Sequence, residues 1–274
     1  QADEQQTGDP AAGIQRIVLQ GRRTILSVRN KEINAMEFWL VPIVFMTSCL
    51  TAVIGMGGGV LLITLMPGLV PPAAIIPIHA CTQLASNCSR AAFGWRDIDL
   101  AIIPAFLVGA MLGAWLGSEI YDSLDLRWLP AIIGVLILLF TWVPLPALRG
   151  DGQFPLAVLG FYQTGLGMVA GATGPLGAAV LMQRNKARDW LVVNTAVYMT
   201  LNHLLRVVAF TAIGFSLAPW WQLVLAMILA GIAGSWVGTR LRPRVPQLDF
   251  QRWFRVLVSL LAARMIALSF LQAM

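Results

Sequence analysis

Two stretches of the sequence combine a glycine-rich break with a stripe of polar side chains that ends in an arginine. The first break spans residues 55–59, and its stripe is His79, Thr82, Gln83, Ser86, Asn87 and Arg90. The second break spans residues 171–175, and its stripe is Asn194, Tyr198, Asn202 and Arg206. Spacings of three or four place each stripe on one face of a helix. Amide and hydroxyl groups beside an arginine suit the binding of an oxyanion.

The glycine breaks suggest that backbone also takes part in such a site. A helix that restarts after a break presents free N–H groups and the positive end of its dipole, which together attract anions. We therefore predict that Gly57, Gly58 and Gly59 in the first break, and Thr173 and Gly174 in the second, contribute to binding. The alternative is that the glycines only allow another helix to cross closely.

The two arginines of the stripes, and His203 beside the second stripe, could have other roles than binding an anion. Arg90 lies close to Trp95, so it could mark a helix end and extend to lipid headgroups. Arg206 is followed by a further apolar run, so we expect it to lie deeper. His203 could relay protons, or it could be a hydrogen-bonded histidine between two helices.

The composition predicts an all-α polytopic membrane protein. The chain is 58% hydrophobic and 12% charged, whereas a soluble domain carries about 25% charged residues. Apolar runs long enough to span a bilayer fall at residues 38–54, 58–70, 73–94, 98–120, 128–147, 154–182, 190–215, 219–239 and 253–273. The second and third are short or polar, so we expect about eight hydrophobic segments in the cell (inner) membrane. The net charge of +6 lies in loops, as membrane topology requires, and predicts no nucleic-acid partner.

The sequence also shows an internal duplication. Asn87 and Asn202 are 115 positions apart, and residues 113–117 resemble residues 234–238. We predict two membrane repeats, residues 36–150 and 151–274, after a polar and basic extension at residues 1–35 that is dispensable. Internal repeats are typical of transporter folds with a site near the membrane midplane. The glycine ladders at 113–117 and 234–238 are interpreted as helix-packing positions.

Topology follows from the basic loops only in part. The arginines near residues 184–188 and 240–255 should share the cytoplasmic side. Counting back one span at a time then places the basic segment near residue 31 outside. A re-entrant element would resolve that conflict, and residues 55–59 are the obvious candidate. Whether the repeats are parallel or inverted stays open.

Several chemistries are not indicated. Residues 55–59 resemble a dinucleotide fingerprint only superficially, because the required βαβ unit is missing. No phosphate-binding loop or metalloprotease motif occurs, and we expect neither enzymatic activity nor a cofactor. A metal- or thiol-dependent assembly factor or enzyme using Cys81, Cys88 and His79 is the alternative function, and a structural subunit without substrate is another.

The sequence resembles the sulfite exporter TauE/SafE family of membrane permeases over about residues 38–272. The resemblance rests on residues 55–62, 70–73, the polar helix leading to 94–99, and the glycine-rich segment 165–177. It implies seven to nine spans built by duplication and transport of small sulfur-containing anions such as sulfite, sulfoacetate or organosulfonates. The second break departs from the family pattern at Ala172, Thr173 and Pro175. We predict a secondary transporter that works by alternating access; a proton or sodium coupling ion and a homo-oligomer stay open.

Overall fold

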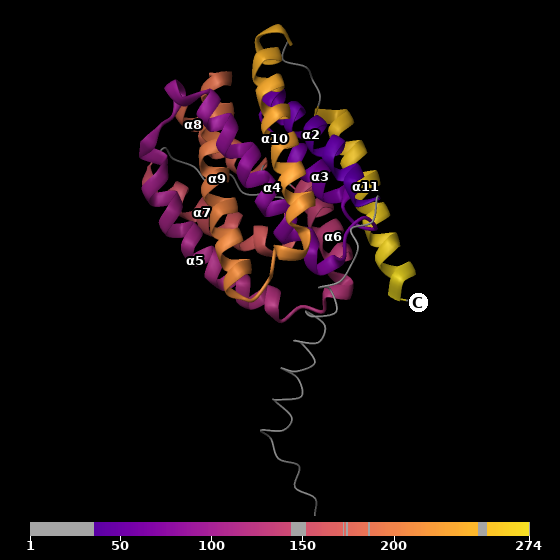
Figure 1. Ribbon diagram of the computed structural model, residues 1–274. Helices are drawn as coiled ribbons and strands as arrows, with labels where there is room; N and C mark the ends of the chain where they lie inside the picture. Colours follow the sequence, from indigo (N-terminus) through magenta and orange to yellow (C-terminus); the bar gives the residue numbers. More distant parts are fainter. Residues whose placement is uncertain are drawn as a thin grey trace, which may run out of the picture.

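A computed structural model describes residues 36–143, 152–171, 173, 175–185, 187–245 and 251–273, and every long element among them is helical. The first part of the chain contains η2 (Glu37–Trp39), α2 (Leu40–Ile54), α3 (Gly58–Leu65), α4 (Pro72–Phe93), η3 (Trp95–Asp97), η4 (Leu100–Ile102), α5 (Ile103–Asp122), η5 (Leu126–Trp128) and α6 (Leu129–Trp142). The second contains α7 (Gln153–Ala170), α8 (Pro175–Arg184), α9 (Arg188–Ala212), η6 (Ala218–Trp220), α10 (Trp221–Leu241), η7 (Arg242–Arg244) and α11 (Gln251–Ala273). Figure 1 shows these helices packed side by side in one bundle. The predicted extension 1–35 lies outside the described residues.

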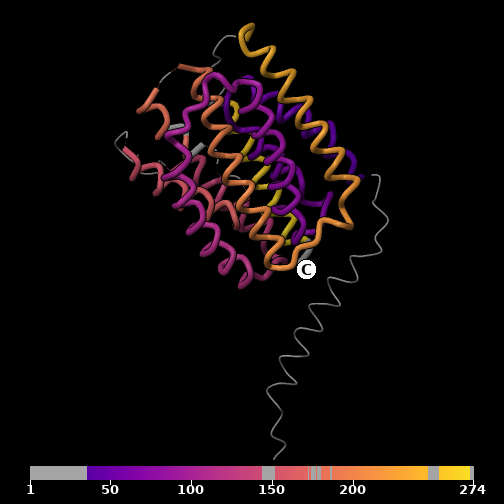
Figure 2. Tube along the Cα trace, turned by 60° about the vertical axis from the view of Figure 1, so that its left-hand side comes forward, coloured from indigo at the N-terminus to yellow at the C-terminus, as the bar shows by residue number. Residues whose placement is uncertain are grey.

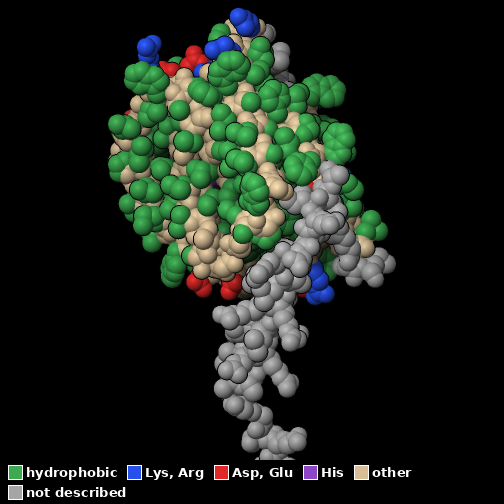
Figure 3. All heavy atoms as spheres, viewed as in Figure 1, with side chains coloured by type: hydrophobic (Ala, Val, Ile, Leu, Met, Phe, Trp, Pro, Cys, Tyr) green, Lys and Arg blue, Asp and Glu red, His purple; other side chains and the backbone are tan. Residues whose placement is uncertain are grey.

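The helices are those of a multi-pass membrane protein, which confirms the predicted fold class. Five of the described helical segments are long and apolar enough to cross a bilayer, and α6 is a shorter apolar helix. Apolar side chains cover the middle of the visible surface, while charged side chains gather at its two ends (Figure 3). Trp39, Trp115, Trp142 and Trp253 are among the exposed aromatic residues. A wide apolar belt of this kind matches the hydrocarbon core of a membrane.

Both glycine breaks reverse the direction of the chain. Gly55 and Gly171 follow α2 and α7 with φ values of 100° and 72°, a conformation that glycine adopts without steric cost. After the first break, Gly58 lies beside Thr47 and Thr51, so α3 runs back along α2. After the second, Thr173 exchanges two hydrogen bonds with Gln163 of α7, at 2.9 and 3.0 Å. Both breaks are therefore re-entrant turns.

The two parts of the chain run in opposite directions through the bundle. α5 is parallel to α7, because successive glycines of α5 face successive carbonyls of α7 in the same order. α4 and α9 are antiparallel, because Gly94 lies against Val193 and His79 lies against His203. Since α3 returns the chain, α4 has the direction of α2, and α5 runs against both. The first helices of the two parts, α2 and α7, are consequently antiparallel, and the repeated element order is inverted.

This topology corrects the expectation of a single re-entrant element. Turns at both breaks leave residue 36 on the face opposite the arginine-rich ends of α8 and α10. Arg184, Arg188, Arg242 and Arg96 lie at the arginine-rich end, and Arg127 lies at the other, paired with Asp125 at 2.6 Å. By the positive-inside rule we expect the arginine-rich end to face the cytoplasm. The predicted boundary between repeats, at residues 150 and 151, lies outside the described residues.

The third long helix of each part packs on the other part. α5 lies along α7 and also contacts α9, while α10 lies along α2 and also contacts α4; Figure 2 shows α10 beside α2 along its length. Glycines make this close approach possible. A Cβ atom on Gly109, Gly113 or Gly234 would lie within 2.2 Å of a carbonyl oxygen on the facing helix. The packing interpretation of the glycine ladders is confirmed, and the ladders join the two parts.

Replacing Gly109 with alanine is expected to destabilise the bundle, because the new methyl would lie 1.8 Å from the Ala157 carbonyl oxygen. Overpacking of this kind costs about 1–3 kcal/mol. Gly152→Ala is the control, since nothing lies within 4 Å of that Cβ position. Thermal unfolding in detergent should show a lower midpoint for Gly109→Ala alone. Equal midpoints for the two variants would contradict the close packing of α5 on α7.

Candidate functional site

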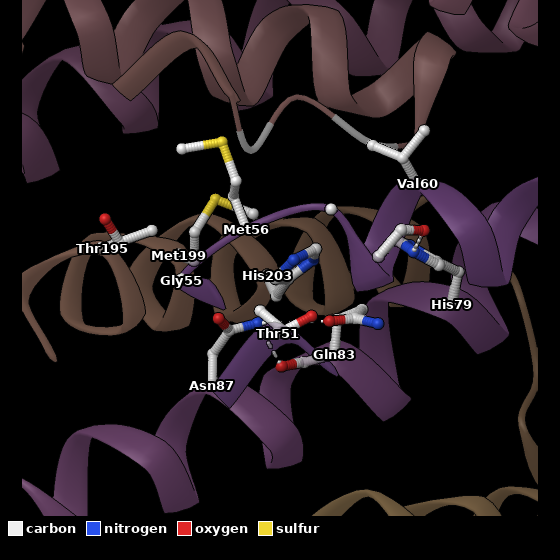
Figure 4. Close-up of a pocket in the computed structure, with 12 residues that line it drawn as sticks. Thr51, Gly55, Met56, Val60, His79, Gln83, Asn87, Thr195, Met199 and His203 are labelled. Carbon is white, nitrogen blue, oxygen red and sulfur yellow. Dashed lines mark hydrogen bonds between the residues drawn. The ribbon is translucent and has the colours of Figure 1, made fainter. Parts of the chain in front are cut away.

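A small cavity lies where the first re-entrant turn meets α4 and α9. It is lined by Thr51, Gly55, Met56, Gly57, Gly59, Val60, His79, Gln83, Asn87, Thr195, Met199 and His203. Its volume of about 30 Å³ exceeds the ~10–15 Å³ that one water needs. Figure 4 shows these side chains grouped around His203, with the break on one side and Gln83 and Asn87 on the other. The cavity therefore combines residues from both parts of the chain.

The beginning of α3 forms one wall of the cavity. Gly57 is the N-cap of α3 and has a φ of 100°. The N–H of Gly58 donates to Thr51 Oγ1 at 3.0 Å, and Thr51 in turn donates to the Thr47 carbonyl. The N–H of Gly58 is thus used inside the protein, and Gly58 does not line the cavity. Gly59 and Val60 are the first-turn residues that do, and they bring the positive end of the α3 dipole with them.

Gly58 and Gly59 consequently have different roles, although the sequence grouped them. A Cβ atom on Gly58 would lie 1.9 Å from the Thr47 carbonyl oxygen, whereas one on Gly59 would lie 3.4 Å from the Gln83 side chain. A bulky residue at position 58 is therefore expected to prevent α3 from packing on α2.

Gly59→Ala is the sharper probe of the cavity. The added methyl is at ordinary contact distance from Gln83 and narrows the space without backbone strain. We expect the unfolding midpoint to stay close to that of wild type, while anion uptake falls several-fold. Gly58→Ala should instead lower the unfolding midpoint, because its methyl meets backbone. Uptake measured in vesicles that contain equal amounts of folded protein checks both. Full uptake by Gly59→Ala would remove the cavity from the transport path.

The polar stripe of α4 provides the second wall. His79, Gln83 and Asn87 are each less than 5% exposed and line the cavity. His79 Nε2 lies 2.9 Å from the Gly59 carbonyl, and Asn87 donates to the Gln83 carbonyl at 2.7 Å. Thr82 and Ser86 of the same stripe bond elsewhere: Thr82 donates to the Ile78 carbonyl, and Ser86 contacts Ser48 and Ser235 on two other helices.

Arg90 lies directly beside this wall. It is 1% exposed, so it does not extend to lipid headgroups, and that interpretation is wrong. Its guanidinium donates to Asn87 Oδ1, while Nε and Nη1 have no hydrogen-bond partner. The cation is thus coupled to the cavity through Asn87, and two of its nitrogen atoms are left without partners.

α9 turns a neighbouring face of the helix toward the cavity. The lining residues Thr195, Met199 and His203 recur every four positions, one residue after the predicted stripe. None of the predicted stripe residues of α9 lines the cavity. Thr195 and Met199 were not among the predicted site residues, and His203 had two interpretations. Their four-residue spacing was the signal that could have found them.

The predicted stripe residues of α9 contact neighbouring segments of the chain instead of the cavity. Asn194 binds the Asp97 carbonyl and the Asp99 N–H, both at 2.8 Å, and so fixes the connection from α4 to α5. Tyr198 packs on Phe106 of α5 with ring centroids 5.3 Å apart. Asn202 donates to Thr164 of α7 at 3.3 Å. Thr173 is bonded to α7 through Gln163, and the predicted site residue Gly174 lies outside the described residues.

Arg206 is connected to the cavity through His203. The Arg206 side chain is fully buried, and its Nη1 donates to the Gly171 carbonyl at 2.8 Å, at the C-terminus of α7. A cation there interacts favourably with the negative end of the helix dipole. The same nitrogen lies 3.3 Å from His203 Nδ1, while Nε and Nη2 have no partner.

Arg90 and Arg206 are thus two buried cations near the cavity, and neither has a carboxylate partner among the described residues. In the described part of the chain, the ion pairs given by the structure are Arg127–Asp125 and Arg242–Asp189, both at the ends of the bundle. An uncompensated buried charge is costly. The arrangement has an excess of positive charge, with hydrogen-bond donors around it, and suits an anion.

The cysteines do not form a cluster with His79. Cys81 is buried and Cys88 is exposed, although the two share a helix face. Among the residues that the structure describes, no group of three histidine, cysteine or acidic side chains is arranged to hold a metal ion. The metal- or thiol-dependent alternative therefore has no geometric support in this part of the chain.

Comparison with known proteins agrees with this architecture. Residues 40–265 match the family described as sulfite exporter TauE/SafE, and the chain belongs to this family of membrane transporters. Over 172 residues the chain is 28% identical to the "Probable inner membrane transporter protein TsaS" of Comamonas testosteroni. That similarity covers 60% of this chain and 69% of the relative. No solved structure matches.

Proposed function

We propose that this chain moves a small sulfur-containing oxyanion, with sulfite as the first candidate, across the inner membrane. The family description supports sulfite as the chemical class, and the printed name of the relative from Comamonas testosteroni supports the inner membrane. The small volume of the cavity favours an inorganic oxyanion over larger sulfonates such as sulfoacetate. The chain is therefore a permease in this proposal, and no bond of the substrate is broken.

The observation that carries the proposal is the pair of buried arginines. Arg90 and Arg206 are at most 1% exposed and lack carboxylate partners among the described residues. A bound anion would neutralise charge that the protein itself leaves uncompensated. Around the cavity, the amides of Asn87 and Gln83 and the first turn of α3 add dipoles suited to an oxyanion. The proposed binding residues are therefore the predicted residues Gly57, Gly59, His79, Gln83, Asn87 and Arg90, with Arg206 acting through His203.

Alternating access is the proposed mechanism. Repeats of opposite direction can exchange their conformations, which opens the same site to either side in turn. The site lies between α4 and α9, which cross antiparallel at the centre of the bundle. The close glycine contacts of α2 with α10 and of α5 with α7 form two units that each contain helices from both repeats. We propose that these units move as rigid bodies around the anion.

Anion flux tests the proposal directly. The purified full chain is placed in liposomes, and efflux of sulfite is compared with that of protein-free liposomes and with sulfoacetate as a larger anion. Sulfite efflux well above the protein-free rate, with slower sulfoacetate efflux, is the expected result. If neither anion moves faster than in protein-free liposomes, the transport proposal fails. Repeating the assay with and without proton or sodium gradients identifies the coupling ion.

A further inference from the structure

The two histidines at the cavity carry complementary unsatisfied atoms. His79 and His203 are each 1% exposed, and their ring centroids are 5.7 Å apart in an edge-to-face arrangement. In each ring one nitrogen is hydrogen-bonded, and the other is buried without a partner. Figure 4 shows both residues at the cavity, one from α4 and one from α9. The bonded partners determine what each free nitrogen offers.

His203 offers a hydrogen-bond donor. Its Nδ1 lies 3.3 Å from Nη1 of Arg206, and a guanidinium has only donors. Nδ1 must therefore accept, and the ring proton of His203 lies on Nε2. Nε2 is the atom that is buried and unpartnered. Arg206 is thus a positioning residue that orients an N–H group at the cavity.

His79 offers a hydrogen-bond acceptor. Its Nε2 lies 2.9 Å from the Gly59 carbonyl, which can only accept. Nε2 therefore carries the proton of the neutral ring, and Nδ1 presents a lone pair. Nδ1 is buried and has no partner. The two histidines that line the cavity consequently leave one donor and one acceptor free on facing helices.

We infer that this pair selects a singly protonated oxyanion, of which hydrogen sulfite is the example. An anionic oxygen accepts from His203 Nε2–H, and the O–H group donates to His79 Nδ1. A sulfonate lacks the O–H group and leaves the His79 lone pair unsatisfied in a buried site, which is costly. The inference rests on the proposed function and specifies the protonation state of its substrate.

The charges around the cavity, taken alone, would favour a dianion over a singly protonated anion. The charged or titratable groups that act on the two histidines are Arg206 of α9 and Arg90 of α4, with Cys81 of α4 beside Arg206. No carboxylate is among the residues that line the cavity. Two cations attract a dianion more strongly than a monoanion. Hydrogen-bond matching and charge therefore predict opposite preferences, which an experiment can separate.

Binding to the wild-type chain is measured by calorimetry in detergent with two ligands at mildly acidic and mildly alkaline pH. Sulfite is mainly hydrogen sulfite at the first pH and the dianion at the second, whereas methanesulfonate keeps one charge and no O–H group throughout. We expect sulfite to bind roughly tenfold more tightly at the acidic pH, and methanesulfonate to bind weakly and equally at both. Tighter binding of the dianion, or equal affinities for both ligands, would overturn the inference and leave the proposed anion transport standing. If neither sulfite nor methanesulfonate binds at either pH, both the inference and the proposed anion transport are overturned.

His79→Met tests the acceptor itself. The variant keeps a side chain of similar size and replaces the imidazole nitrogen with a thioether, which accepts hydrogen bonds only weakly, so the preference for hydrogen sulfite over methanesulfonate should fall to about twofold or less. Leu204→Met is the matched control, because it introduces the same side chain on α9 at a position that is 44% exposed and does not line the cavity. Its preference should equal that of wild type. An unchanged preference in His79→Met would overturn the inference, and the wild-type ligand series stands as the test if the variant does not fold.

Discussion

Arg90→Met is expected to weaken anion binding roughly tenfold to hundredfold while leaving the ligand-free protein equally stable or more stable. Arg90 is 1% exposed, and its only hydrogen bond in the described structure is to Asn87. Removing a buried charge that lacks a counter-ion relieves its desolvation cost, and a buried apolar side chain of similar length is often stabilising. The bound anion would lose the positive charge that is coupled to the cavity through Asn87. If this loss equals that of one charge-assisted hydrogen bond, about 1.5–3 kcal/mol, the affinity should fall roughly tenfold to hundredfold.

This prediction is specific because the variant should lower anion affinity without lowering the stability of the ligand-free protein. Thermal unfolding is followed with and without sulfite, because a ligand that binds only the folded state raises the midpoint. Wild type should gain stability with sulfite, and Arg90→Met should not. Arg96→Met is the control, since Arg96 is exposed at the arginine-rich end and should change neither quantity. Loss of stability in Arg90→Met, with the sulfite shift retained, would assign Arg90 a structural role.

Arg206→Gln is expected to lower both stability and affinity. Arg206 donates to the carbonyl of Gly171, the C-cap residue of α7, and contacts His203. Glutamine therefore removes a buried charge and the group that orients the histidine. Leaving the Gly171 carbonyl unsatisfied costs about 1–3 kcal/mol. Anion affinity should fall roughly tenfold or more, and the loss reaches the anion through His203 rather than by direct contact.

Arg206→Lys separates the charge from the geometry. Lysine keeps the positive charge and a donor for Gly171, but it lacks the planar guanidinium that serves two acceptors. We expect the unfolding midpoint to recover most of the loss, while affinity recovers only in part. The measurement is sulfite calorimetry beside thermal unfolding for the three proteins. Affinity equal to wild type in Arg206→Gln would remove Arg206 and its effect on His203 from the site.

The sequence by itself determined the class of the protein and the place of one half of its site. In a bilayer, the backbone N–H and C=O groups of a long apolar segment find hydrogen-bond partners within that segment only if it is a helix. The all-α membrane fold therefore followed from composition and segment length. The three- and four-residue spacing of His79, Gln83 and Asn87 determined a shared helix face, because α-helical periodicity is local. Glycines that can adopt a positive φ marked the two turns, and glycines spaced by four marked close helix contacts.

Only the tertiary structure decided how these local elements combine. The direction of the repeats depends on whether each break crosses the membrane or returns, and that is settled by packing of Gly58 on Thr47 and of Thr173 on Gln163. The rotation of α9 about its axis, set by its neighbours α4, α5 and α7, turns Thr195, Met199 and His203 to the cavity instead of Asn194, Tyr198 and Asn202. Burial of Arg90 likewise depends on helices distant in sequence. Spacing along a helix groups residues on a face, but contacts with other helices determine what that face meets.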